Sequence, residues 1–137
     1  MADLSVTPAD VVKVSGNVKH GTAGATITQG QAVYQKSTDG EWYLAQADGT
    51  AEESGYGVEV GIALIAAADG QPIVVQTSGE ITPGVAAAVG IIYCVSETAG
   101  GIAPIAEITT DSYVTILGVG DSANIDLSIQ ASGSQVQ

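Results

Sequence analysis

Apolar and polar residues alternate along most of the chain with the two-residue period of a β-strand rather than the 3.6-residue period of a helix. The alternating segments are short and rich in Val, Ile, Tyr and Thr, which are typical strand residues. Turn sequences such as TDGE, ADGQP, AGG and GDSAN separate them. The pattern predicts strands at residues 32–35, 41–46, 55–64, 72–79, 90–96, 112–120 and 125–133.

One helical turn is predicted, near the start of the chain. Residues 7–12 contain Thr7, which could cap a helix, followed by Pro8, which suits the first helical position. The rest of the sequence predicts few or no helices.

A strand and its following turn occur twice. GQPIVVQTSG at residues 70–79 is echoed by NIDLSIQASG at residues 124–133. Before each of these, a second pair of similar sequences occurs in the same order: ATITQGQAVYQ at residues 25–35 and EITPGVAAAVGIIYCVS at residues 80–96. Two copies are too few for an open solenoid. We therefore interpret residues 25–79 and 79–133 as pseudo-repeats, each a small sheet that buries its apolar face on the other, with Val74 and Val75 equivalent to Leu127 and its neighbours.

The predicted fold class is all-β: a compact, β-tulip-like barrel or sandwich of short strands with two pseudo-duplicated halves. A chain of 137 residues fits a single domain. We divide it into an N-terminal arm at residues 1–17 and one β-domain at residues 18–137. Aromatic residues make up only 4% of the chain and Phe is absent, so the core must consist mainly of small aliphatic side chains.

Charge is distributed unevenly. The cationic side chains are Lys13, Lys19 and Lys36, whereas thirteen acidic residues and no basic residue follow residue 36. This balance argues against binding to nucleic acid or to an anionic membrane, both of which require clustered Lys and Arg. The first residues lack the basic and apolar blocks of a signal peptide, and no apolar run is long enough to span a bilayer, so we expect synthesis in the cytoplasm.

The sequence offers little for catalysis or metal binding. His20 is the only histidine, and its surroundings predict an exposed loop. Cys94 is the only cysteine, which excludes an intrachain disulfide and a multi-cysteine metal site. We expect Cys94 to be a buried small side chain.

The carboxylates form no recognisable site either. Glu52 and Glu53 are adjacent, which suits solvation better than a converging acid pair. Asp121, Asn124 and Asp126 supply oxygen ligands but lack the length and the closing Glu of a calcium-binding loop. The sequence therefore predicts no enzyme, no cofactor and no metal.

An ordered series of glycine- and alanine-rich strand sequences carries a family resemblance. From about residue 14 to residue 133, the chain resembles the head decoration, or capsid cement, proteins of tailed bacteriophages and prophages; AEESGYGVEV departs from their pattern. The resemblance implies a structural virion protein on the capsid exterior, which binds the major capsid protein, bridges its subunits and stabilises the shell. It also implies a homotrimer, although dimeric and monomeric arrangements exist. The series reads GNVKHGTAGATITQGQAVYQ, DGEWYLAQADGTA, VGIALIAAADGQPIVVQTSGEITPG, VSETAGGIAPIAEI and VTILGVGDSANIDLSIQASG.

The N-terminal arm is the predicted contact with the capsid. LSVTPADVVKVSGNV begins with apolar-polar alternation, lies before both pseudo-repeats and contains one of the lysines. Such an arm can add to an exposed sheet edge of a capsid subunit. The alternative is an ordinary edge strand of the protein's own sheet. The candidate contacts are Leu4, Val6, Val11, Val12 and Lys13.

Trp42 and Tyr43 suggest an alternative function. Adjacent strand residues point to opposite faces, so one ring could be exposed and stack on a sugar, as in a phage adhesion or carbohydrate-binding module. A ring buried in the core or at a subunit interface is the other interpretation. A third class, a free cytoplasmic assembly protein, also fits the residues.

Overall fold

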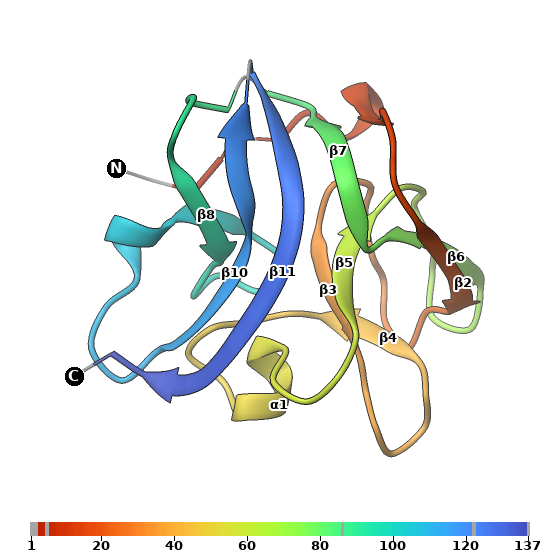
Figure 1. Cartoon of the computed structure of the whole chain (residues 1–137). Helices are drawn as coiled ribbons and strands as arrows, with labels where there is room; N and C mark the ends of the chain where they lie inside the picture. The colour runs from red at the N-terminus through yellow and green to blue at the C-terminus, as the bar shows by residue number, and fades with distance from the viewer. Residues whose placement is uncertain (1–2, 5, 86, 122, 137) are drawn as a thin grey trace.

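The computed structural model describes residues 3, 4, 6–85, 87–121 and 123–136. It confirms the all-β fold: two antiparallel sheets form one compact unit (Figure 1). The six-stranded sheet has the order β1-β7-β11-β10-β8-β9, and the five-stranded sheet has the order β2-β6-β5-β3-β4. The first sheet consists of β1 (Val11–Lys13), β7 (Ser78–Pro83), β8 (Ile92–Val95), β9 (Ile102–Pro104), β10 (Tyr113–Asp121) and β11 (Asn124–Gln135). The second consists of β2 (Val18–Thr22), β3 (Ala32–Gln35), β4 (Trp42–Leu44), β5 (Val60–Ala63) and β6 (Pro72–Gln76).

Three short helical segments accompany the sheets: η1 (Pro8–Asp10), α1 (Ala51–Ser54) and η2 (Ile105–Glu107). η1 confirms a helical turn after Thr7, but the Thr7 side chain makes no capping hydrogen bond. Across the described part of the chain, no helix is long and apolar enough to cross a membrane.

Three predictions of local structure are wrong. The strand predicted at residues 72–79 is divided, because β6 ends at Gln76 and β7 begins at Ser78 in the other sheet. His20 lies on β2 rather than in a loop, although its side chain is exposed. The predicted strand at residues 55–64 begins only at Val60, because the preceding residues form α1 and its end. Thr50 and Glu53 make a reciprocal capping box at the start of α1, and Gly55 ends it with φ +112°.

The two sheets share one topology. The order β2-β6-β5-β3-β4 in the first half of the chain (residues 18–76) matches β7-β11-β10-β8-β9 in the second half (residues 78–135). Gly30 and Gly90 occupy equivalent turns 60 residues apart, both with positive φ, and their N–H groups donate to the carbonyls of Ala63 and Gly120. β1 has no counterpart in this scheme.

The register of the match agrees with the predicted equivalence of Val74 and Val75 to Leu127 and its neighbours, but not with a literal alignment of the two echoed sequences. Lys19 of β2 faces Val75, and Gly79 of β7 faces Leu127. Because Lys19 and Gly79 are equivalent at the 60-residue offset, Val75 is equivalent to Leu127, and both are buried. The sequence echo instead aligns Ile73 with Leu127. This slip of two residues leaves each side chain on the same face of the sheet.

The halves do supply a shared main core, as expected, but the packing is one-sided, because the first half also has a core of its own. Each half is a curved sheet with a concave inner face and a convex outer face (Figure 1). On the inner face of the first half, Trp42 packs with Ile73 and Val75 in a separate cluster. The equivalent inner face of the second half packs instead against the outer face of the first half. That main core combines Ile81, Tyr93, Val95, Ile102, Leu117, Ile125 and Leu127 of the second half with Ala32, Tyr34, Val60 and Ile62 of the first.

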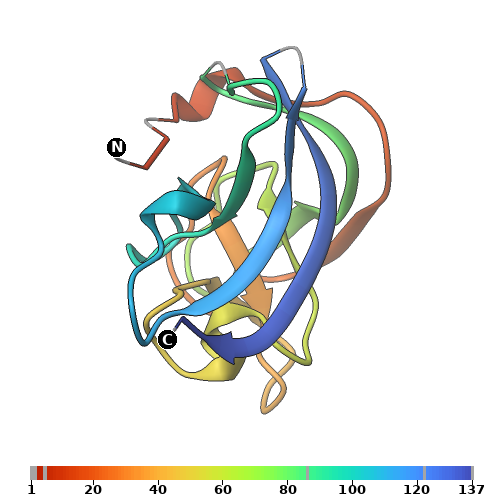
Figure 2. The same ribbon diagram turned by 60° about the vertical axis from the view of Figure 1, so that its left-hand side comes forward.

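Trp42 explains the difference between the halves. Ala23, which follows β2, forms a bridge with Trp42 and brings the two edges of the five-stranded sheet together. A Cβ atom at Gly21 would lie 2.6 Å from the Trp42 Nε1 atom, so the indole fills this face only because residue 21 is glycine. The first half is therefore closed around one large ring, and the second half stays open. Its β10–β11 hairpin extends over the height of the molecule to α1 (Figure 2).

Candidate interaction surface

The N-terminal segment (described residues 3, 4 and 6–17) lies against the second half rather than extending as a free arm. The Leu4 N–H group donates to the Ile102 carbonyl of β9 at 2.9 Å. The Thr7 N–H group donates to the Gly84 carbonyl, just after β7, at 3.1 Å. Near the start of the segment, the Asp3 carboxylate accepts a hydrogen bond from the Ser96 hydroxyl at 2.7 Å. The segment thus spans the opening between β7 and β9.

After η1, the same segment becomes the edge strand β1. The Val11 N–H group donates to the Pro8 carbonyl and ends the turn. Val11, Val12 and Lys13 then pair with Pro83, Thr82 and Ile81 of β7. Of the two interpretations that the sequence leaves open for residues 11–13, the structure shows the edge strand of the protein's own sheet.

The five candidate contacts fall into two groups. Val11 is 4% exposed and belongs to the main core, and Leu4 and Val6 are half-buried against it. A core position leaves the Val11 side chain no surface to offer a partner. Val12, in contrast, is 55% exposed, and Lys13 is exposed beside it.

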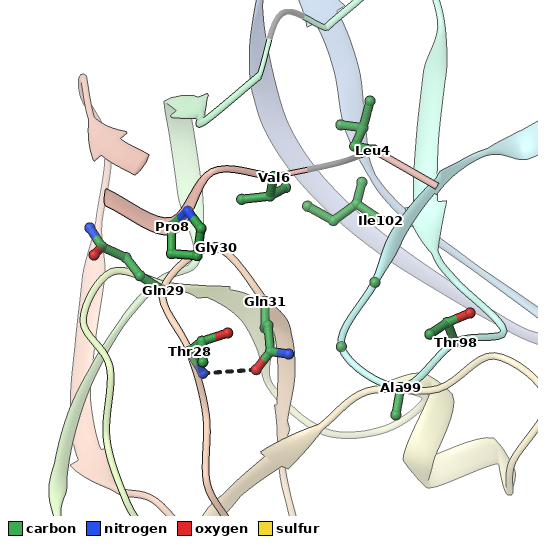
Figure 3. A pocket seen from close by; sticks show the side chains of 12 residues that line it. Leu4, Val6, Pro8, Thr28, Gln29, Gly30, Gln31, Thr98, Ala99 and Ile102 are labelled. Carbon is green, nitrogen blue, oxygen red and sulfur yellow. Dashed lines mark hydrogen bonds between the residues drawn. The ribbon is translucent and has the colours of Figure 1, made fainter. Parts of the chain in front are cut away.

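A pocket of about 240 Å³ lies under the N-terminal segment (Figure 3). Leu4, Val6 and Pro8 form one wall, and the loops at residues 28–31 and 98–101 form the other. The Thr28 N–H group donates to the Gln31 side-chain oxygen at 2.8 Å and shapes the first loop. None of the described residues that line the pocket carries an ionisable side chain.

The two adjacent aromatic residues do lie on opposite faces, but neither presents a free ring. Trp42 is 1% exposed in the first-half core and cannot stack on a sugar. The Tyr43 hydroxyl donates to the Asp39 carboxylate at 2.6 Å, and the Lys36 ammonium lies 5.0 Å from the ring centroid. The hydrogen bond to Asp39 raises the pKa of Tyr43 to about 12. Trp42 is therefore not the ring that could stack on a sugar, and Tyr43 is held by its own contacts to Asp39 and Lys36.

Glu52, Glu53 and Asn124, which the sequence raised as candidates, have structural roles. Glu52 accepts hydrogen bonds from the backbone N–H and the hydroxyl of Ser37, which lower the pKa of Glu52. Glu53 closes the capping box of α1. The Asn124 amide donates to the Glu80 carboxylate at 2.7 Å.

Nothing in the described residues assembles a metal or nucleophilic site. No group of three or more His, Cys, Asp or Glu side chains within the described ranges is placed to hold a metal ion. Cys94 is fully buried, and burial raises the pKa of its thiol to about 11, which opposes formation of the reactive thiolate.

Comparisons with known proteins do not identify a relative. No protein family, no curated protein and no solved structure matches the chain.

Proposed function

We propose that the chain is a structural virion protein that binds the exterior of an assembled phage capsid and stabilises it by bridging capsid subunits. The observation that carries the proposal is β1, an ordered edge strand whose outer side includes the exposed residues Val12 and Lys13. Such a strand is suited to β-augmentation, because its backbone is already fixed before the partner arrives. The resemblance to capsid cement proteins names the partner class, the major capsid protein.

The hydrogen bonds of β1 indicate which backbone groups face the partner. The Val14 N–H group donates to the Glu80 carbonyl of the neighbouring strand at 2.9 Å. Because alternate residues of an antiparallel strand bond to the same side, the backbone groups of Lys13 face away from β7. The outward groups of Val11 are already used, by the Pro8 carbonyl and the Gln29 amide. Lys13 is thus the backbone position that a capsid strand would meet.

The proposal divides the predicted contacts by role. Val12 and Lys13 contact the capsid, whereas Leu4, Val6 and Val11 position β1 by packing on the core. One or two backbone hydrogen bonds give little affinity alone. A homotrimer would present three such strands at a high effective concentration and convert weak contacts into firm attachment.

Co-sedimentation with purified, expanded phage heads tests the proposal. Lys13→Pro removes the outward N–H donor, and proline is tolerated on the free side of an edge strand. We expect this variant to bind about tenfold more weakly. The matched control Lys13→Ala also loses the charged side chain but keeps the donor, and should change binding about threefold or less. Failure of the wild-type protein to sediment, or equal binding by Lys13→Pro, would contradict the proposal.

A further inference from the structure

β11 has strand neighbours of unequal length on its two sides. β10 pairs with it from Asn124 to Gln135, whereas pairing with β7 stops at Ser128 opposite Ser78. Among the described residues, positions 129–135 therefore have β10 as their one strand neighbour. Figure 1 shows β7 beside the upper part of β11 only. An unpaired strand edge exposes backbone N–H and C=O groups that can accept another strand.

The first half of the chain has no equivalent edge. β6, the counterpart of β11, ends at Gln76, which pairs with Val18 of β2 and Ile62 of β5. Residues 129–135 continue beyond the point where β6 ends. The free edge thus belongs to an extension of the second half.

A groove of about 550 Å³ follows this free edge. Ile129 and Ala131 of β11 form one side, and Tyr56, Val58 and Glu59 form the other. Val58 and Ile129 are half-buried against the main core, so the floor of the groove is apolar and firmly supported.

Tyr56 forms an aromatic wall of the groove. Its side chain is 52% exposed, although it packs beside Gly133 of β11. A Cβ atom at Gly133 would lie 2.6 Å from a carbon of the Tyr56 ring, so glycine provides the space for this ring. A partly exposed Tyr on an apolar floor is a common anchor at protein interfaces.

The charge of the whole molecule, rather than that of the groove, indicates what it would bind. Glu59 is the only charged residue in the lining of the groove, and Lys19 already pairs with it, while Lys36 lines the adjoining hollow. The chain as a whole has a net charge of -12, and thirteen acidic residues but no basic residue follow residue 36. This excess attracts a basic segment and repels an acidic one.

We propose that this groove is a β-augmentation site for an extended segment of another protein that alternates apolar and basic side chains. The segment pairs with β11 at residues 129–131, its apolar side chains pack on Tyr56, Val58 and Ile129, and a Lys or Arg shares Glu59 with Lys19. Pairing ends near residue 132, because the Ser134 N–H group turns to the Ser132 hydroxyl. The site goes beyond the proposed function, because it lies on the edge of β11 rather than on that of β1.

An NMR titration of the full chain tests the site without any capsid. The probe is the peptide acetyl-VKVKVKV-amide, and the matched control is acetyl-VEVEVEV-amide. We expect the lysine peptide to shift amide signals of residues 55–60, 77 and 129–131, and to bind at least about tenfold more tightly than the glutamate peptide.

Two variants at similar exposure localise the binding. Tyr56→Ala should weaken the lysine peptide about tenfold or more, whereas Val119→Ala, at an exposed position of β10, should leave binding unchanged. Equal binding of the two peptides, shifts away from the groove, or an unchanged affinity of a folded Tyr56→Ala protein would overturn the inference. Groove shifts that depend on protein concentration alone would also overturn it, because they would assign the groove to a second copy. Capsid co-sedimentation is a separate measurement, so either proposal can fail while the other stands.

Discussion

The side chain of Gln76 ties three segments of the backbone together. It is fully buried at the end of β6, and its amide nitrogen donates to the carbonyls of Ser15, Ser78 and Glu80 at 2.8, 3.0 and 3.0 Å. These carbonyls belong to the N-terminal segment and to β7. Gln76→Glu keeps the shape of the side chain but replaces the donating amide with a carboxyl group. Gln76→Met keeps a similar length and carries no charge.

The expected loss of stability has two parts. Glu80 also accepts from the Val14 N–H group, so the amide matters most for the other two carbonyls. In the Met variant, each buried carbonyl that loses its donor costs about 1–3 kcal/mol. The Met variant also removes the buried Gln76 Oε1 atom, which has no partner, and this offsets part of the cost. The expected net loss of stability is about 2 kcal/mol. A buried carboxyl beside carbonyl oxygens has a pKa raised by up to about 3 units, which adds about 4 kcal/mol once it must ionise.

The sign of the pH dependence follows from the raised pKa. Because the folded-state pKa of Glu at position 76 lies above its unfolded value of about 4.3, the added penalty is absent below pH 4. It grows as the pH rises and is complete above the folded-state pKa. Urea unfolding at pH 4 and at pH 7.5, followed by tryptophan fluorescence, measures the free energy of unfolding of each variant. The penalty is the difference between the variant and the wild type at each pH.

The Met variant separates the two parts of the argument. Its difference from wild type should be the same at both pH values, whereas that of Gln76→Glu should be larger by about 4 kcal/mol at pH 7.5. A Gln76→Glu protein as stable as wild type at pH 7.5, or a difference that does not change with pH, would show that position 76 is not enclosed by carbonyl groups as described.

Three other measurements examine separate parts of the structure. Trp42→Ala should lower the free energy of unfolding by about 4 kcal/mol, since the ring fills the first-half core, and an exposed-type emission spectrum of the native protein would contradict this position. The Cys94 thiol, with its pKa raised to about 11 by burial, should resist a disulfide reagent at pH 8 until the chain unfolds; rapid native reaction would refute its burial. Glu97 accepts hydrogen bonds from Ser112 and Thr109, which lower its pKa, so Glu97→Gln should cost about 1 kcal/mol at pH 7. That cost should disappear as the pH falls through the folded-state pKa, and a pH-independent difference in urea unfolding would argue against the ionic form of the contact.

The strands were predictable because their patterns are local. Alternation alone predicts a strand at residues 32–35, where β3 lies. The turn at Gly40, with φ +73°, is predictable because glycine tolerates positive φ. α1 was also predictable, because Thr50 and Glu53 have the spacing of a capping box.

The candidate site was less predictable because it depends on contacts between distant residues. Nothing near Val11 in the sequence shows that its neighbours will pair with β7, about 70 residues later. The burial of Trp42 likewise depends on the missing side chain at Gly21, which pairs with Ile73 in the neighbouring strand. A strand residue with an aromatic ring has two faces available, and only the assembled sheets determine which is filled.

The one-sided packing of the halves accounts for both proposed binding edges. Trp42 closes the first half on itself, so its strands β2 and β4 meet and leave no opening. The second half has Ile102 at the equivalent position and wraps around the first half instead, which separates β7 from β9. The N-terminal segment fills that opening and continues as β1, and β11 extends past β7 to cover the first half. The edges of β1 and β11 therefore arise from the same asymmetry, and the surfaces most suited to partners lie where the duplicated topology is not repeated.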